Sequence, residues 1–157
     1  MQLQLQAADA HELLQHALEI VRRDIEDRHL ELSVSLEASS HDVMVDPPRL
    51  QQVFWNVLRN ACKFTPDHGT VSVRSHNPSP KSITVEISDT GVGIEPQFLD
   101  KIFDAFEQID SHQEGLGLGL AISKAIIEMH GGSVRARSAG LGKGATFVID
   151  LPLDRTH

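Results

Sequence analysis

The segment DPPRLQQVFWNVLRNACKFTP, residues 46–66, decides the fold, because it predicts a helix with a defined start, face and end. Asp46 suits the N-cap and Pro47 suits the first helical position. Apolar residues recur on one face at helical spacing: Leu50, Val53, Phe54, Val57, Leu58 and Ala61. The helix is expected to run to about Lys63, before Pro66 stops it. A helix with one apolar face needs a second layer to pack against.

Further periodic segments flank this helix and supply that layer. Residues 8–22, with Asp9 as N-cap, and residues 118–129, capped by Gly131-Gly132, predict two more helices. Alternating polarity predicts strands at 30–36, 43–45, 71–73, 83–87, 133–137 and 145–151. Antiparallel hairpins should join 71–73 to 83–87 through Asn77-Pro78-Ser79-Pro80, and 133–137 to 145–151. We expect an α+β two-layer sandwich, with helices on one face of a mostly antiparallel mixed sheet.

Length and composition restrict the class of protein. A chain of 157 residues forms one domain, 1–157, without a disulfide or metal to hold its core. The net charge of −8 argues against a general nucleic-acid binder, but not against binding of one nucleotide. No apolar run is long enough to insert into a membrane, and the lone Cys62 fits a reducing compartment. We therefore expect a cytoplasmic location, either free or as the cytoplasmic part of a membrane-tethered sensor.

Three polar residues share one side of the helix over 46–63. Asn56, Asn60 and Lys63 are spaced by four and three residues, beside the apolar face. An Asn oxygen is a hard ligand suited to Mg²⁺, and an ammonium group suits phosphate. The alternative is a helix flank whose Asn side chains bond to nearby backbone, and on this stretch alone both interpretations stay open.

Two glycine-containing loops are the other candidate site elements. In Asp89-Thr90-Gly91-Val92-Gly93, a carboxylate at a strand end could accept from an exocyclic amine, while glycines let a flat ring approach. The alternative is a tight turn capped by the Asp. The run 115–119, with glycine at every second position, enters a helix and could hold phosphate on its N–H groups. Its alternative is a flexible hinge, since it matches neither the dinucleotide fingerprint nor a P-loop.

The order and spacing of these motifs resemble the ATP-binding domain of sensor histidine kinases. Asn56 to Pro66, Asp89-x-Gly91-x-Gly93, Phe103-x-x-Phe106 and the run 115–119 match that family's N, G1, F and G2 boxes in order. The resemblance covers nearly the whole chain and implies a Bergerat-type fold, with ATP and Mg²⁺ as cofactors.

The resemblance also implies roles for individual residues. Asn60 would ligate Mg²⁺, Asn56 would support the metal or phosphates, and Lys63 would contact phosphate, so that these three carry catalysis. Asp89 would accept a hydrogen bond from the adenine amino group. The other residues implied to line the nucleotide site are Gly91, Gly93, Ile94, Phe106, Gly115, Leu116, Gly117, Leu118, Gly119 and Thr146.

Asn56 favours a kinase over an ATPase. Gyrase-type relatives carry a Glu at the matching position as the general base for water, and an amide cannot take that proton. The implied reaction transfers the γ-phosphoryl group to a histidine on the dimerisation domain of the parent kinase. A response-regulator receiver domain is the second implied partner.

Two features depart from the family pattern. His11-Glu12 begins like the family's phosphoacceptor motif but lacks its Arg and Pro, so we expect His11 and His16 to face solvent on a helix, and the phosphoacceptor domain to be absent from this chain. The segment between Phe106 and Gly115, a polar loop that would form the ATP lid, is short and has no Lys or Arg.

The short lid leaves a non-catalytic nucleotide-binding module on the same fold as an alternative. An anti-sigma-type serine kinase is another. The Phe103-x-x-Phe106 and Lys63-Phe64-Thr65-Pro66 sequences favour the histidine kinase over the serine kinase.

Overall fold

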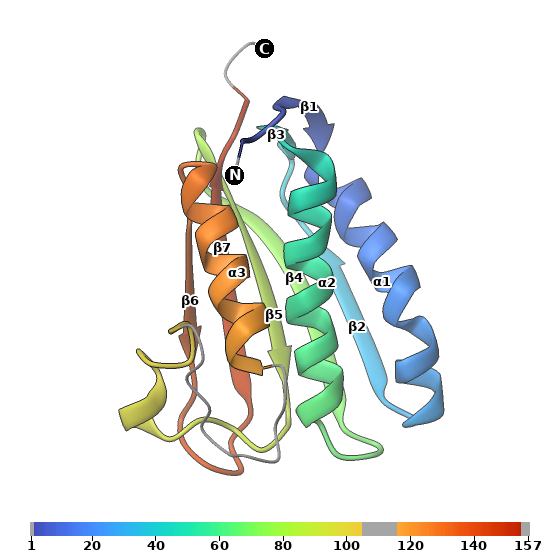
Figure 1. The fold of residues 1–157 in the computed structure, drawn as a ribbon. Coiled ribbons are helices and arrows are strands. Elements are labelled where there is room, and N and C mark those ends of the chain that lie inside the picture. Colours follow the sequence, from blue (N-terminus) through green and yellow to red (C-terminus); the bar gives the residue numbers. More distant parts are fainter. Residues whose placement is uncertain (1, 105–115, 155–157) are drawn as a thin grey trace.

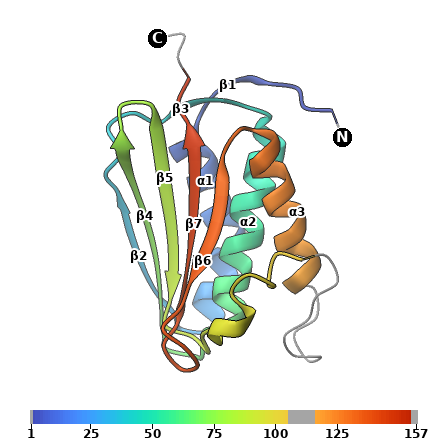
Figure 2. The ribbon, with the colours of Figure 1, turned by 90° about the vertical axis from the view of Figure 1, so that its left-hand side faces the viewer.

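A computed structural model describes residues 2–104 and 116–154, which form two layers (Figures 1 and 2). One layer is a five-stranded sheet with strand order β2-β4-β5-β7-β6. Its strands are β2 (Glu31–Leu36), β4 (Thr70–Ser79), β5 (Ser82–Asp89), β6 (Ser133–Arg137) and β7 (Ala145–Pro152). β2 pairs with β4 in parallel and the other pairs are antiparallel. The expected mostly antiparallel mixed sheet is therefore confirmed.

The described helices form the second layer and cover one face of the sheet, as Figure 2 shows. They are α1 (Ala10–Asp27), α2 (Pro47–Phe64) and α3 (Leu116–Met129). Two short strands, β1 (Gln6–Asp9) and β3 (Asp42–Val45), pair antiparallel outside the main sheet, and a 3-10 turn, η1, spans Pro96–Phe98. None of the described helices is both long and apolar enough to cross a bilayer.

Helix α2 lies between α1 and α3 (Figure 1) and supplies the centre of the core. The predicted apolar face of α2 is completely or almost completely buried. It packs over the inward residues of the sheet, among them Ile83, Val85 and Ile87 of β5, which are also fully buried. The free Cys62 lies in this core, and burial raises the pKa of its thiol to about 11.

The two predicted N-caps have different outcomes. The Asp9 carboxylate accepts from the backbone N–H of His11 at 2.9 Å, as expected for the start of α1. Asp46 occupies the N-cap position of α2 but makes no capping hydrogen bond. Instead its Oδ2 accepts from the N–H of Gln4 at 3.0 Å, and its own N–H donates to Nε2 of the buried His130 at 3.0 Å. The start of α2 is thus tied to the end of α3 rather than capped from within.

Some boundaries differ from the sequence expectation. Helix α1 continues to Asp27, and β4 continues to Ser79, so the turn to β5 lies at Pro80-Lys81. Of the helical segment expected over 98–106, only the 3-10 turn ending at Phe98 and the turns to residue 104 fall within the described residues.

Strand β2 is more exposed than its alternating pattern predicts. Leu32 and Val34 are 41% and 45% exposed, although their register partners Val71 and Val73 are fully buried. The reason is position, because β2 is an edge strand with a neighbour on one side only, and the helical layer contacts it little.

A single arginine closes the C-terminal end of α2. Nη1 of Arg28 donates to the carbonyl oxygens of Cys62, Lys63 and Thr65 at 2.6, 2.9 and 3.0 Å. Carbonyls at a helix end lack partners within the helix, and a cation there also interacts favourably with the helix dipole. Arg28 therefore fixes the turn of α2 that carries Lys63.

We expect Arg28→Ala to lower the free energy of unfolding by roughly 1–3 kcal/mol, because charged hydrogen bonds to these carbonyls are lost. Arg23→Ala, at an exposed position on α1, is the matched control and should change stability by less than about 0.5 kcal/mol. Urea denaturation followed by circular dichroism measures both. Equal effects of the two substitutions would contradict the role given to Arg28.

Candidate nucleotide-binding site

The predicted site elements meet at one end of the molecule. In Figure 1 the end of α2, the end of β5, the start of β7 and the start of α3 all lie at the lower end. Residues distant in the sequence thus come together at one end of the helices and of the central strands β5 and β7.

The loop after β5 packs directly against the last residue of α2. The carbonyl oxygen of Phe64 accepts the N–H of Val92 at 3.1 Å. A Cβ on Gly91 would lie 2.2 Å from that same oxygen, so residue 91 has no room for a side chain. On the other side, Gly144 N–H donates to Gly91 O at 3.2 Å, ahead of β7. The loop is therefore held between the end of α2 and the start of β7.

Gly93 is also required by the backbone. Its φ is +74°, and a Cβ there would lie 2.1 Å from the carbonyl oxygen of Gly140. Next to it, the N–H of the buried Ile94 donates to Ser138 Oγ at 3.0 Å. These contacts give the loop a fixed shape.

Asp89 ends β5 at the head of this loop. Its Oδ1 accepts the N–H of Gly91 at 2.8 Å, so the tight turn considered as the alternative is present. Burial raises the pKa of the Asp89 carboxyl, and hydrogen bonds from the N–H groups of Gly91 and Ala145 offset this only in part. A partly desolvated carboxylate beside a glycine backbone is a strong acceptor for a ligand N–H.

The side chain of Thr146 does not lie on the face of the sheet that carries Asp89, and the expectation that it lines the site is corrected. Its hydroxyl bonds Ser88 Oγ at 2.9 Å, and the two residues are register partners. Side chains alternate along a strand, so Thr146 and Ser88 face away from the side that carries Asp89 and its partner Ala145. Ala145 is the β7 residue at the site, and a shift of one residue explains the error.

The amide of Asn56 has a defined orientation. Asn56 Nδ2 donates to Ser123 Oγ of α3 at 3.3 Å, and Ser123 Oγ donates to the Gly119 carbonyl at 2.9 Å. Because the Ser123 hydroxyl donates its proton to the Gly119 carbonyl, it can only accept a hydrogen bond from Asn56. The NH₂ group of Asn56 must face α3, and its oxygen must face away from Ser123. The described contact of Asn56 is thus with a side chain of α3, and not with nearby backbone as the alternative interpretation had it.

Asn60 and Lys63 lie further along α2 towards the Asp89 loop. Asn60 is half-buried and Lys63 is exposed, with its Nζ 5.5 Å from the centroid of the Phe64 ring. Asn60 and Lys63 thus lie in the last turns of α2, which end beside the loop after Asp89, whereas Asn56 lies at the middle of the helix.

The remaining predicted residues are described only in part. Phe106, Gly115 and the segment between them lie outside the described residues. Leu116, Gly117 and Leu118 form the first turn of α3, followed by Gly119. Before the gap, Phe103 meets Phe147 edge to face at 6.1 Å.

Ser123 contacts the predicted site residue Asn56, and the sequence interpretation missed it. Ser123 is fully buried, and the helix positions about one turn away include Leu120, Ile126 and Ile127, which are also fully buried. A hydroxyl at a core position of such a helix was the available signal, because buried polar groups require partners. Its partner on α2 could not be identified from the sequence.

The acceptor-like histidine is not solvent-facing, which corrects the expectation for His11. Its Nε2 lies 2.8 Å from Ser75 Oγ, and its ring stacks on that of His41 at 3.9 Å. His16 is exposed, as expected. His11 is in the first turn of α1, and in Figure 1 the start of α1 is at the opposite end of the molecule from the ends of α2 and β5.

Comparison with known proteins identifies the class. Residues 45–155 match the family described as "Histidine kinase-, DNA gyrase B-, and HSP90-like ATPase". The chain belongs to this family, and within it to the catalytic ATP-binding domains of sensor histidine kinases.

Individual relatives agree. The sensor histidine kinase ZraS of Escherichia coli is 36% identical over 155 residues, covering 99% of this chain and 32% of ZraS, so the chain spans about a third of that relative. The mycobacterial sensor histidine kinase MprB is 33% identical with a TM-score of 0.84, covering 95% of this chain and 97% of that structure. Histidine kinase ThkA in complex with response regulator protein TrrA has a TM-score of 0.82 at 23% identity, covering 97% of this chain and 42% of that one, and supports the fold.

Ser123→Ala should weaken Mg²⁺-dependent ATP binding by roughly tenfold, about the free energy of one hydrogen bond, because the Asn56 amide loses its fixed orientation. Binding of ADP without Mg²⁺ should change little. Calorimetric titrations with and without Mg²⁺ separate the two effects. Ser88→Ala removes a hydroxyl from the other face of the sheet and is the control. If both variants bind Mg-ATP like the parent, Ser123 does not position Asn56.

Proposed function

We propose that this domain binds Mg-ATP and transfers its γ-phosphoryl group to a histidine on the dimerisation domain of the parent kinase. The observation that carries the proposal is the partly desolvated Asp89 beside Gly91, in a loop that packs against the end of α2, the helix that carries Asn56 and Asn60. A carboxylate for a base and amides for a metal and phosphates match the two halves of a nucleotide.

Asp89 is proposed to read adenine. Its carboxylate accepts from the exocyclic amine, and Gly91 and Gly93 allow the close backbone packing that fixes the loop beside Asp89. Guanine presents a carbonyl where adenine presents the amine. Two acceptors would then face each other, and GTP should be excluded.

The residues of α2 fit a magnesium ion and phosphates. Asn60 would hold Mg²⁺ through its amide oxygen, and the Asn56 oxygen, facing away from Ser123, would support the metal or a phosphate. Bound Mg²⁺ neutralises phosphate charge as it develops during transfer. Lys63 is proposed to contact phosphate as a point charge, and the first turn of α3, with Gly117 and Gly119, to present backbone N–H groups to it.

The chain supplies positioning rather than a base. Asn56 cannot accept a proton from water, so hydrolysis has no general base at that position. In the proposed reaction, a ring nitrogen of the acceptor histidine forms a bond to the γ-phosphorus while the bond to the bridging oxygen of ADP breaks. ADP leaves with the electron pair of that bond, the other ring nitrogen gives up its proton to solvent, and phosphohistidine is the product.

The proposed partners follow from this reaction. The acceptor histidine belongs to a dimerisation domain, since the described histidines lie in no acceptor motif of this family. The next recipient would be a response-regulator receiver domain, and the assembly of ThkA with TrrA supports this proposal. A cytoplasmic location, where ATP is available, completes the proposal.

Asp89→Asn should weaken ADP and ATP binding by roughly 10- to 100-fold, because a charged acceptor for the adenine amine is lost. The parent domain should bind GTP far more weakly than ATP. Calorimetry with the three nucleotides measures this. Equal affinities of the parent for ATP and GTP would show that Asp89 does not read the base.

The same variant carries its own folding control. Because burial raises the pKa of Asp89, ionised Asp89 costs folding free energy at neutral pH, and this cost is lost as the pH falls through the raised pKa. Asp89→Asn should therefore be at least as stable as the parent at neutral pH, with a difference that shrinks in acid. Denaturation at a series of pH values checks this.

Asn60→Ala should abolish most phosphoryl transfer while retaining binding of ADP without Mg²⁺, because only the metal ligand is removed. The measurement mixes the domain, Mg-ATP labelled at the γ-phosphate and a separate family acceptor domain, and detects acid-labile phosphohistidine. Transfer by the parent distinguishes a kinase from a non-catalytic nucleotide-binding module. Unchanged Mg²⁺ dependence in Asn60→Ala would rule out its metal role.

A further inference from the structure

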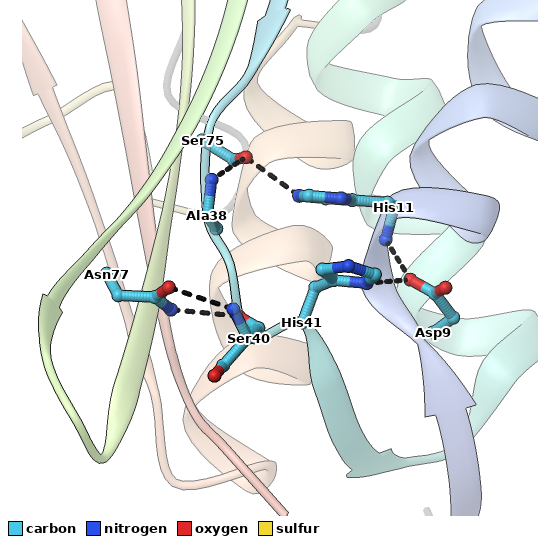
Figure 3. Close-up of polar contacts among 7 residues, drawn as sticks. All are labelled: Asp9, His11, Ala38, Ser40, His41, Ser75 and Asn77. Carbon is cyan, nitrogen blue, oxygen red and sulfur yellow. Dashed lines mark hydrogen bonds and ion pairs between the residues drawn. The ribbon is translucent and has the colours of Figure 1, made fainter.

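Three side chains of metal-ligating types lie together near β1 and β3, at the opposite end of the molecule from the candidate nucleotide-binding site. Asp9 ends β1, His11 is in the first turn of α1, and His41 directly precedes β3. One ligand atom from each lies within 4.8 Å of the other two. Figure 3 shows the two imidazole rings one above the other, with Asp9 beside them. Three segments of the chain therefore bring ligands to one place.

Each of these residues is oriented by further polar contacts. His41 Nδ1 lies 2.6 Å from Asp9 Oδ1, and since the carboxylate can only accept, this nitrogen carries a proton. His11 Nε2 lies 2.8 Å from Ser75 Oγ, which also accepts the N–H of Ala38 at 3.2 Å. His11 thus uses Nε2 for Ser75, and Nδ1 is the nitrogen that can turn towards an ion. Such outer hydrogen bonds are what orient metal-ligating histidines.

We propose that Asp9, His11 and His41 bind one divalent transition-metal ion of the Zn²⁺ class. One carboxylate oxygen and one ring nitrogen from each histidine would be the protein ligands, with water in the fourth position. Two imidazoles and a carboxylate suit Zn²⁺ in number and type. Mg²⁺ prefers oxygen ligands and should not compete. The site is independent of the proposed nucleotide chemistry.

Binding requires a small rearrangement. Ligand atoms around tetrahedral Zn²⁺ lie about 3.3 Å apart. The rings are now stacked, with 3.9 Å between centroids and 16° between planes, so they must turn to converge on the ion. The side chains of His41 and Asp9 are 32% and 30% exposed, which leaves them room to turn. A pocket of about 250 Å³, lined by His41, Ser40 and Asp42 among others, gives access from solvent.

The proton balance of this step is defined. The ion takes the place of the proton on His41 Nδ1, and a neutral imidazole then carries its proton on Nε2 instead. Binding to a neutral His41 should therefore release no net proton. It should also tie the end of β1 to the start of β3 and raise the melting temperature.

The test is a calorimetric titration of the nucleotide-free chain with Zn²⁺, in two buffers of different protonation enthalpy. At about pH 8, where an imidazole is neutral, we expect one saturable site, the same heat in both buffers because no net proton is released, and a visible absorption band when Co²⁺ replaces Zn²⁺. His11→Ala and His41→Ala should each weaken binding by at least about tenfold. If His41→Ala does not fold, His41→Gln replaces it in the test, because the Gln amide can still donate to Asp9 while the imidazole ligand is removed. ADP affinity should be unchanged in His41→Gln.

Two sets of other histidines provide matched controls. His16 is exposed on the same helix, and His29 stacks on His68 at 5.3 Å as a second imidazole pair. His16→Ala and the double change His29→Ala, His68→Ala should leave Zn²⁺ affinity unaltered. The proposal is overturned if no saturable site exists, if His41→Gln binds Zn²⁺ like the parent, if excess Mg²⁺ displaces the ion, or if only the His29 and His68 changes abolish binding.

Discussion

The carbonyl oxygen of Phe64, the last residue of α2, sets the geometry on which the rest of the site depends. It accepts the N–H of Val92 and lies so close to the Gly91 Cα that a Cβ there would come within 2.2 Å of it. A helix end thus touches a loop backbone without an intervening side chain. This contact joins the element that carries the amides to the loop that follows the carboxylate.

Further interactions hold the start and the end of α2. His130 accepts the N–H of Asp46, and Arg28 binds the carbonyls of Cys62, Lys63 and Thr65. With both ends held and the apolar face buried, α2 has little freedom to shift along its axis. That rigidity suits a site in which the proposed work is positioning and charge stabilisation rather than proton transfer.

The two layers contribute different chemistry to the proposed site. The sheet contributes Asp89, whose burial makes it an effective acceptor for a base. The helices contribute the amides of α2, one of them oriented by Ser123, and the backbone of the first turn of α3. Neither layer has a complete set of nucleotide contacts, so nucleotide binding should depend on how the layers pack.

The sequence predicted the parts of this arrangement that depend on local periodicity. The apolar face of α2, the strands around it and the order of the motifs were sufficient for the fold class and the family. Interactions between distant segments were not predictable in the same way. Ser123 meets Asn56 across 67 residues and His11 meets Ser75 across 64, and no local pattern encodes either pairing. The expectation for Thr146 was wrong because successive side chains of a strand point to opposite faces of the sheet, so an error of one position puts the side chain on the wrong face. Asp46 has the right residue type for an N-cap, but its carboxylate accepts the N–H of Gln4 and none from the first turn of α2.

The most direct test of the dependence on Phe64 is a calorimetric titration of ADP into Gly91→Ala. A methyl group at 2.2 Å from a backbone oxygen must push the loop away from α2. Val92→Ala, at an exposed position in the same loop, leaves the backbone contact intact and serves as the control. We expect ADP affinity to fall by at least about tenfold in Gly91→Ala and to stay within about twofold in Val92→Ala, with both variants folded by circular dichroism. Full ADP affinity in a folded Gly91→Ala domain would contradict the claim that this contact shapes the nucleotide site.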